Sequence, residues 1–169
     1  AIDLGTDLLP ALALGMEKPE PDVMQRPPRR KDQSLLDKAL VGRALWLGLI
    51  ETALCYAGFM LVNAQAGFAN ILHLPYDQWE PLAGRMATDA GRVYILASTV
   101  FHAGVVMAQI GNAFACRTEK ARVRQMGFFA NRHLLLGIAV EVLIILLLIY
   151  VPPLAWLFEH SPLKLEHWS

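Results

Sequence analysis

Three long stretches of almost uninterrupted apolar residues organise this chain. They cover roughly residues 44–66, 93–115 and 134–151. Each is close to the about 17 to 25 residues that an α-helix needs to cross the hydrocarbon core of a bilayer. Each therefore predicts a transmembrane helix. A shorter apolar segment, residues 1–16, opens the chain and predicts most of one further membrane helix.

The long stretches contain very few ionisable residues. Residues 93–115 include no Lys, Arg, Asp or Glu, and His102 is their one side chain of a type that titrates near neutral pH. We interpret it as a packed core histidine. The other two stretches contain one acid each, Glu51 and Glu141. An unpaired charge at mid-membrane costs at least about 2.5 kcal/mol, so we expect Glu141 to be protonated or to face other helices. Structural pairing and ion contact are both open for Glu141, whereas for Glu51 we favour a bond to a neighbouring helix.

The composition agrees with a membrane protein. Hydrophobic residues make up 55% of the 169 residues, too many for an ordinary soluble domain. We predict an all-α, multi-pass transmembrane bundle with the lipid bilayer as its surroundings and no nucleic-acid partner. The chain has no P-loop, no GxGxxG and no HExxH pattern, so we expect neither catalytic residues nor a cofactor site within it.

The basic residues indicate how the chain crosses the membrane. Twelve of the 15 Lys and Arg residues lie in or next to two connections, residues 17–43 and 116–133. Connections rich in Lys and Arg stay on the cytoplasmic side of a membrane. We therefore place these two loops in the cytoplasm and both ends of the chain near the outer side.

The opening segment contains the clearest candidate chemistry. Asp3, Thr6 and Asp7 stand at i, i+3 and i+4, so on a helix all three side chains fall on one face. Gly5 and Pro10 weaken the helical hydrogen bonding nearby, which frees carbonyl oxygens to join the side-chain oxygens. This pattern predicts a cage for a hard cation, and the alternative is a pair of helix-end acids at the outer interface. Two carboxylates this close should share a proton when the site is empty.

A second polar pair lies on the stretch 93–115. Gln109 and Asn112 are three residues apart and share a helix face. Two interpretations are open, because such amides serve both as hydrogen-bonding groups between membrane helices and as ion ligands.

Several segments together resemble parts of a single protein family. The run Ile2-Asp3-Leu4-Gly5-Thr6-Asp7-Leu8-Leu9-Pro10-Ala11 and the later Arg26-Pro27-Pro28-Arg29 look like the sixth membrane helix of the P-type cation pumps and its cytoplasmic loop. Gly48-Leu49-Ile50, Gln109-Ile110-Gly111-Asn112 with Cys116-Arg117, and Tyr150-Val151-Pro152-Pro153 are similar to the seventh, eighth and ninth helices. The resemblance assigns residues 1–16, 44–66, 93–115 and 134–151 to these four helices of a ten-helix transport domain.

The resemblance also implies roles for individual residues. Asp3, Thr6 and Asp7 match positions that coordinate the transported ion, and Gln109 and Glu141 match further sodium-pump positions. Asn112 is a departure, because the sodium pump has an Asp there. Oxygen ligands without a Cys-Pro-Cys signature imply Na⁺, K⁺ or Ca²⁺ as cargo. Arg26 and Arg29 would belong to a loop that couples phosphorylation to the ion sites.

The same resemblance implies how the chain works. ATP and Mg²⁺ would act in other parts of a complete pump, whose remaining helices and cytoplasmic domains would be the partners of this chain. The short loops lead us to expect a prokaryotic plasma membrane as its location. The Ser-Tyr-Gly-Gln sequence that receives the sodium pump's accessory subunit is missing, so we expect no such subunit. Two alternatives are a small stand-alone channel or permease subunit and a non-functional structural remnant.

Overall fold

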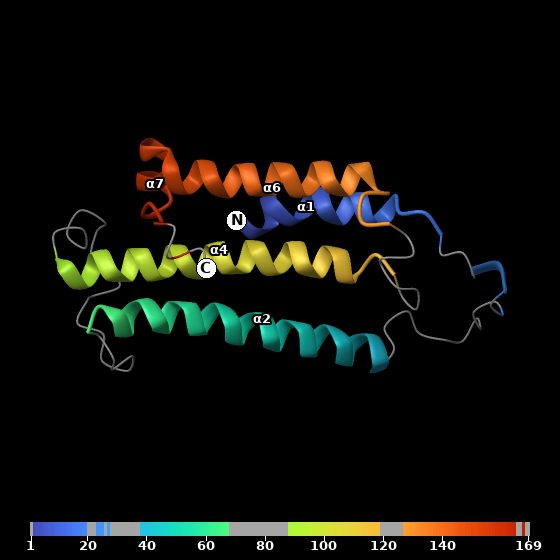
Figure 1. Cartoon of the computed structure of the whole chain (residues 1–169), viewed down its shortest axis with the longest axis horizontal. Coiled ribbons are helices and arrows are strands. Elements are labelled where there is room, and N and C mark those ends of the chain that lie inside the picture. Colours follow the sequence, from blue (N-terminus) through green and yellow to red (C-terminus); the bar gives the residue numbers. More distant parts are fainter. Residues whose placement is uncertain are drawn as a thin grey trace. The chain divides into compact units, whose positions relative to one another are not determined.

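The computed structural model describes residues 2–19, 23–25, 27, 38–67, 88–118, 127–164 and 167, with side chains for all of these except 2–7 and 39. Every regular element in these ranges is a helix, which confirms the predicted all-α fold (Figure 1). The elements are α1 (Ile2–Gly15), the short 3-10 helix η1 (Val23–Gln25), α2 (Lys38–Gln65), α4 (Asp89–Ala115), α6 (Arg132–Tyr150) and α7 (Pro152–Leu157).

Three of these helices are long and apolar enough to cross a membrane. The candidate spans are Leu40–Gln65 in α2, Asp89–Ala115 in α4 and Arg132–Tyr150 in α6. All three helices begin a few residues before the predicted apolar stretches, at Lys38, Asp89 and Arg132. Each helix therefore extends beyond the apolar segment that would cross the hydrocarbon core.

Side-chain caps explain where two of these helices begin. The backbone N–H of Gly91 donates to Thr88 Oγ1 at 3.1 Å before α4, and the N–H of Leu134 donates to Asn131 Oδ1 at 3.0 Å before α6. A cap of this kind satisfies one of the N–H groups that the first turn of a helix leaves without a helical partner.

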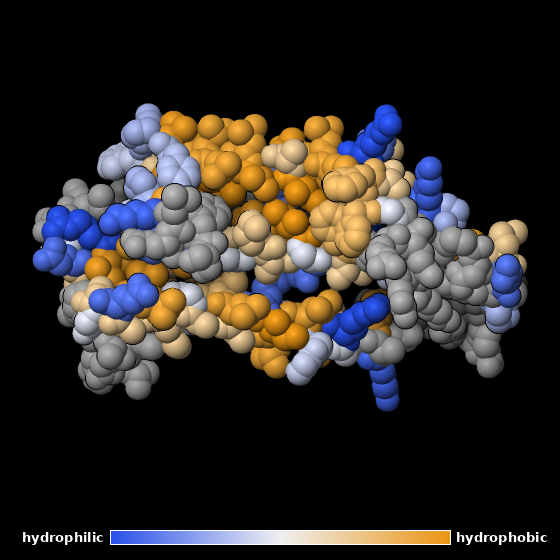
Figure 2. All heavy atoms as spheres, in the orientation of Figure 1, coloured by the Kyte–Doolittle hydropathy of each residue, from blue (hydrophilic) through white to orange (hydrophobic). Residues whose placement is uncertain are grey.

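The surface of the long helices is strongly apolar. On α2, the side chains of Leu45, Trp46, Leu49, Leu54 and Leu61 are all more than half exposed. Figure 2 shows hydrophobic residues covering the middle of the helices and hydrophilic residues gathered toward helix ends. Contiguous exposed apolar surface of this kind suits contact with lipid or with further membrane helices.

The chain divides into two compact units, and the first comprises the described residues of Ala1–Glu51 and Ala108–Glu141. Its core is formed by Ala13 of α1, Ala113 of α4 and Leu134 of α6, all buried. Gly137 of α6 lies directly against the backbone of α1: a Cβ added there would be 3.0 Å from the backbone nitrogen of Pro10. A side chain at position 137 would therefore force the two helices apart.

The second unit comprises the described residues of Thr52–Met107 and Val142–Ser169. Within it, Cys55 of α2 is buried against Gly104 of α4, where an added Cβ would approach the Cys55 sulfur to 3.3 Å. The segment after α7 is joined to α4 by Ser161, whose N–H donates to Thr99 Oγ1 at 2.9 Å.

Candidate functional site

A partly open cavity of about 350 Å³ lies in the first unit. Residues of α1, α2 and α4 line it with mainly apolar surface and a few polar side chains. It is lined by Pro10, Ala11, Leu14, Glu51, Gln109, Asn112, Ala113 and Cys116.

The spacing of the α4 residues explains why they share this cavity. Gln109, Asn112, Ala113 and Cys116 stand at i, i+3, i+4 and i+7, which is one face of an α-helix. The structure thus brings the two predicted amide ligands, Gln109 and Asn112, to the same cavity.

Glu51 and Asn112 form a direct contact between two membrane-spanning helices. Asn112 Nδ2 donates a hydrogen bond of 2.9 Å to Glu51 Oε2, across 61 positions of sequence. This confirms the expectation that Glu51 bonds a neighbouring helix. It also shows that Asn112 does act between helices, while both side chains still line the cavity.

Of the three predicted ion ligands on α1, the structure describes the backbone alone. The backbone of Asp3, Thr6 and Asp7 is helical within α1, and their side chains lie outside the described residues. Pro10 lies inside α1, and because proline has no N–H, the carbonyl of residue 6 lacks its usual helical donor.

Glu141 occupies a separate position on α6. It is 1% exposed and is not among the residues that line the cavity between α1, α2 and α4. The predicted coupling residues Arg26 and Arg29 lie outside the described residues.

Sequence reasoning missed a buried ionic network at one end of this unit. The Arg117 guanidinium binds the Glu17 carboxylate through two hydrogen bonds, Nε to Oε2 at 3.0 Å and Nη2 to Oε1 at 2.9 Å. The Arg117 side chain is 0% exposed and that of Glu17 is 10% exposed. Arg117 Nη1 also donates to the carbonyl oxygens of Gly127 and Phe128. This arginine therefore joins the end of α1 to the chain that follows α4.

Asn131 completes this network. Its Nδ2 donates to the carbonyl of Ala13 at 3.0 Å and to Glu17 Oε2 at 2.8 Å, while its Oδ1 caps α6. The hydrogen bond from Arg117 is the largest effect on the Glu17 carboxyl and holds its pKa below the ordinary value. The sequence signals for this pair are a Glu two residues after α1 and an Arg two residues after α4. The interpretation of Arg117 as one of the basic residues of a cytoplasmic loop does not reveal its partner.

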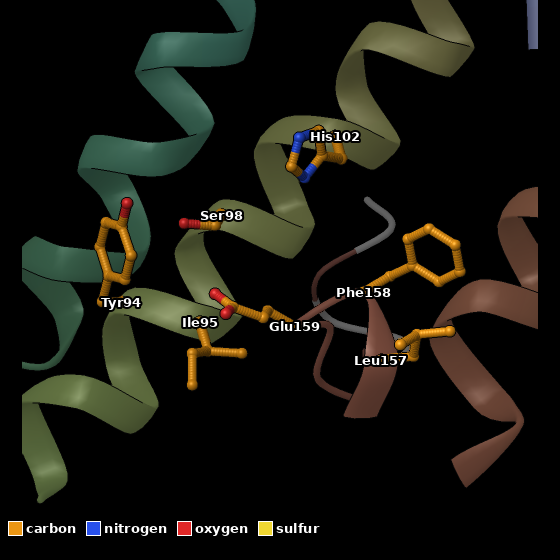
Figure 3. Close-up of a pocket in the computed structure, with 7 residues that line it drawn as sticks. All are labelled: Tyr94, Ile95, Ser98, His102, Leu157, Phe158 and Glu159. Carbon is orange, nitrogen blue, oxygen red and sulfur yellow. The ribbon is translucent and has the colours of Figure 1, made fainter. Parts of the chain in front are cut away.

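A second cavity, of about 290 Å³, lies in the second unit (Figure 3). Tyr94, Ser98 and His102 line it from α4, and Glu159 lies opposite them, after the end of α7. Figure 3 shows the Glu159 side chain extended toward Ser98. Leu157 and Phe158 contribute apolar surface, and Ile95 completes the lining.

Two histidines meet in the same unit. The ring centroids of His102 and His160 are 5.3 Å apart. His160 is buried, and neither of its ring nitrogens has a hydrogen-bond partner among the described residues. Burial is the main cause that lowers the pKa of His160, and the nearby His102 lowers it further. The expected packing role of His102 agrees with these ring contacts.

These features define a class: a multi-pass helical membrane protein whose spans enclose amide and carboxylate groups. Comparison with known proteins identifies the family. The chain matches the cation transporting ATPase C-terminus model over residues 1–169, and it belongs to that family.

Individual relatives agree with this assignment. The chain is 31% identical to the potassium-transporting ATPase alpha chain 2 of Oryctolagus cuniculus, across 99% of this chain and 16% of that protein. It is 29% identical to the sodium/potassium-transporting ATPase subunit alpha-4 of Rattus norvegicus, across 99% of this chain and 17% of that protein. The chain thus spans about one sixth of the length of these relatives and corresponds to a membrane region of a P-type cation pump.

Proposed function

We propose that this chain is the C-terminal membrane region of an ATP-driven pump that carries Na⁺ or K⁺ by alternating access. The observation that carries the proposal is the cavity in which Gln109 and Asn112 of α4 meet Glu51 of α2 beside α1. Carboxylate and amide oxygens are the ligands that hard cations prefer. The family assignment supports a role of this cavity in cation transport.

The ion ligands in this proposal are Asp3, Thr6 and Asp7 on α1, Gln109 and Asn112 on α4, and Glu141 on α6. The names of the relatives, which are potassium and sodium/potassium pumps, favour a monovalent cargo over Ca²⁺. The buried position of Glu141 on α6 favours a role inside the helix bundle over one at the lipid surface.

Other parts of the complete pump would supply the chemistry. ATP and Mg²⁺ would bind there, and phosphorylation would move the membrane helices so that the site opens alternately to the two sides. We further propose that loops 17–43 and 116–133 face the cytoplasm of a prokaryotic plasma membrane, that Arg26 and Arg29 transmit the motion, and that no accessory subunit of the sodium-pump type is required.

The first experiment replaces the two α1 carboxylates in the complete pump. In Asp3→Asn and Asp7→Asn, we expect the ion concentration for half-maximal phosphorylation by ATP to rise about tenfold or more, since each change removes one charged ligand. Asp89→Asn is the matched control, because Asp89 is an exposed acid paired with Arg92 away from the cavity.

The alternatives give different results. Ion-dependent phosphorylation that is unchanged in both variants would contradict the assignment of Asp3 and Asp7. A channel or permease subunit would conduct ions without ATP and form no phosphoenzyme, and a structural remnant would show neither activity.

A further inference from the structure

Glu51 is an acid within a membrane span, and nothing in the resemblance assigns it to the ion path. It lies inside the span Leu40–Gln65, is half-buried, and points its carboxylate at Asn112 on α4. An ionisable side chain at this depth is expensive and usually has a functional reason.

The contact with Asn112 places the carboxylate at the cavity wall. Of the residues described as lining the cavity, Glu51 is the one carboxylate, and the neutral amides of Gln109 and Asn112 line the cavity with it. The bond from Asn112 Nδ2 also orients that amide, so that its carbonyl oxygen is on the side away from Glu51.

The volume and charge of the cavity favour a single monovalent cation as its ligand. A volume of about 350 Å³ is more than ten times the roughly 30 Å³ share of one water molecule, so the cavity has room for a partly hydrated ion. One negative charge among neutral amide oxygens is balanced by a single positive charge. Tight Ca²⁺ sites instead gather several carboxylates.

We propose that Glu51 is the charged ligand of a subsite for one monovalent cation in this cavity, with Asn112 holding its carboxylate in place. The inference rests on the proposed function and adds a ligand from α2 to it. Asn112 is uncharged. In this proposal Glu51 on the facing helix α2 supplies the negative charge, and the hydrogen bond from Asn112 Nδ2 to Glu51 Oε2 joins the two helices.

The test exchanges the two ends of this bond in the complete pump. The variants are Glu51→Gln, Asn112→Asp and the double variant that combines them. Glu51→Gln keeps an acceptor for Asn112 Nδ2 and removes only the charge. The double variant restores one carboxylate and one amide, with the charge on α4 in place of α2.

The readout is equilibrium binding of radioactive Na⁺ and of Rb⁺ as a K⁺ substitute to the purified pump, alongside ion-dependent phosphorylation. We expect Glu51→Gln to weaken binding of one of these ions about tenfold, and the double variant to recover most of that loss. Glu159→Gln, which neutralises an exposed acid in the other unit, should bind both ions as the unaltered pump does.

A purely structural bond makes the opposite prediction. In that case Glu51→Gln binds ions normally, because the Gln side chain still accepts the hydrogen bond from Asn112 Nδ2. A further variant, Glu51→Leu, which cannot accept that bond, then binds ions more weakly. That result overturns the inference and leaves the proposed function intact. Absence of any ion-dependent binding or phosphorylation in the unaltered pump would overturn the proposed function, and this inference with it.

Discussion

At the scale of single residues, the contact between Glu17 and Arg117 shows how a membrane protein uses a buried ion pair. Arg117 makes hydrogen bonds to both Glu17 oxygens and to two backbone carbonyls, so its charge is surrounded by acceptors. Removing one partner of such a pair leaves an uncompensated buried charge, which typically costs about 3–5 kcal/mol. The pair therefore holds the end of α1 in a defined position.

Glu17→Gln should lower the free energy of unfolding in mixed micelles by about 3 kcal/mol at neutral pH, since it removes the charge facing Arg117. The pKa of Glu17 in the folded chain lies below its ordinary value of 4.5, so its contribution is complete above about pH 4.5. As the pH falls through the lowered pKa, that contribution disappears.

Titration of unfolding against detergent at several pH values checks this expectation. The difference between the unaltered chain and Glu17→Gln should shrink toward zero at acidic pH. Asp89→Asn is a suitable control, because the side chains of Asp89 and Arg92 are 87% and 55% exposed and their pair contributes little. Equal stability of Glu17→Gln and the unaltered chain at pH 7 would contradict this account.

At the scale of elements, the crossing of α1 and α6 depends on a glycine. An added Cβ at Gly137 would lie 3.0 Å from the Pro10 nitrogen and 3.1 Å from the carbonyl carbon of Leu9. Both neighbours are backbone atoms of α1, so they cannot move aside as the tip of a side chain can. Small residues permit such close approach of helices in membranes.

Gly137→Ala should therefore destabilise the chain in mixed micelles by about 1–3 kcal/mol, a cost typical of overpacking. In the complete pump it should also weaken ion binding, because α1 carries Asp3, Thr6 and Asp7. Gly111→Ala on α4 is the matched control: among the described residues, nothing beyond its chain neighbours and its own helix backbone lies within 4 Å of the added Cβ. A Gly137→Ala variant as stable as Gly111→Ala would show that α1 and α6 tolerate a wider separation.

At the scale of the whole molecule, the distribution of basic residues predicts which end of each span is cytoplasmic. Cys116 directly follows α4 and is exposed, whereas Cys55 is buried in the second unit. The two cysteines thus provide a reporter and an internal control for orientation.

A membrane-impermeant maleimide should modify Cys116 in inside-out vesicles and leave it unmodified in right-side-out vesicles. Cys55 should react in neither preparation until the protein is denatured, because it is buried between helices. Mass spectrometry of the labelled peptides gives the answer. Modification of Cys116 from the outer side would reverse the proposed topology.

Much of the fold could be predicted from the chain alone, because long apolar runs and clustered basic residues act locally. The three spans and the all-helical class follow from such patterns. The helix starts could not be located as well, since Thr88 and Asn131 act as caps that an apolar pattern does not reveal. The side-chain arrangement at Asp3, Thr6 and Asp7 stays a prediction.

The sequence by itself determined that the chain has helices long and apolar enough to cross a membrane, that it belongs to the cation transporting ATPase C-terminus family, and which segment has Asp3 and Asp7. These properties depend on the length of the apolar stretches, on the charged residues and on sequence motifs, all of which are the same for any arrangement of the helices. Only the tertiary structure decided which polar groups meet. Glu51 bonds Asn112 across 61 positions and Glu17 bonds Arg117 across 100, because the rotation and packing of whole helices set those contacts.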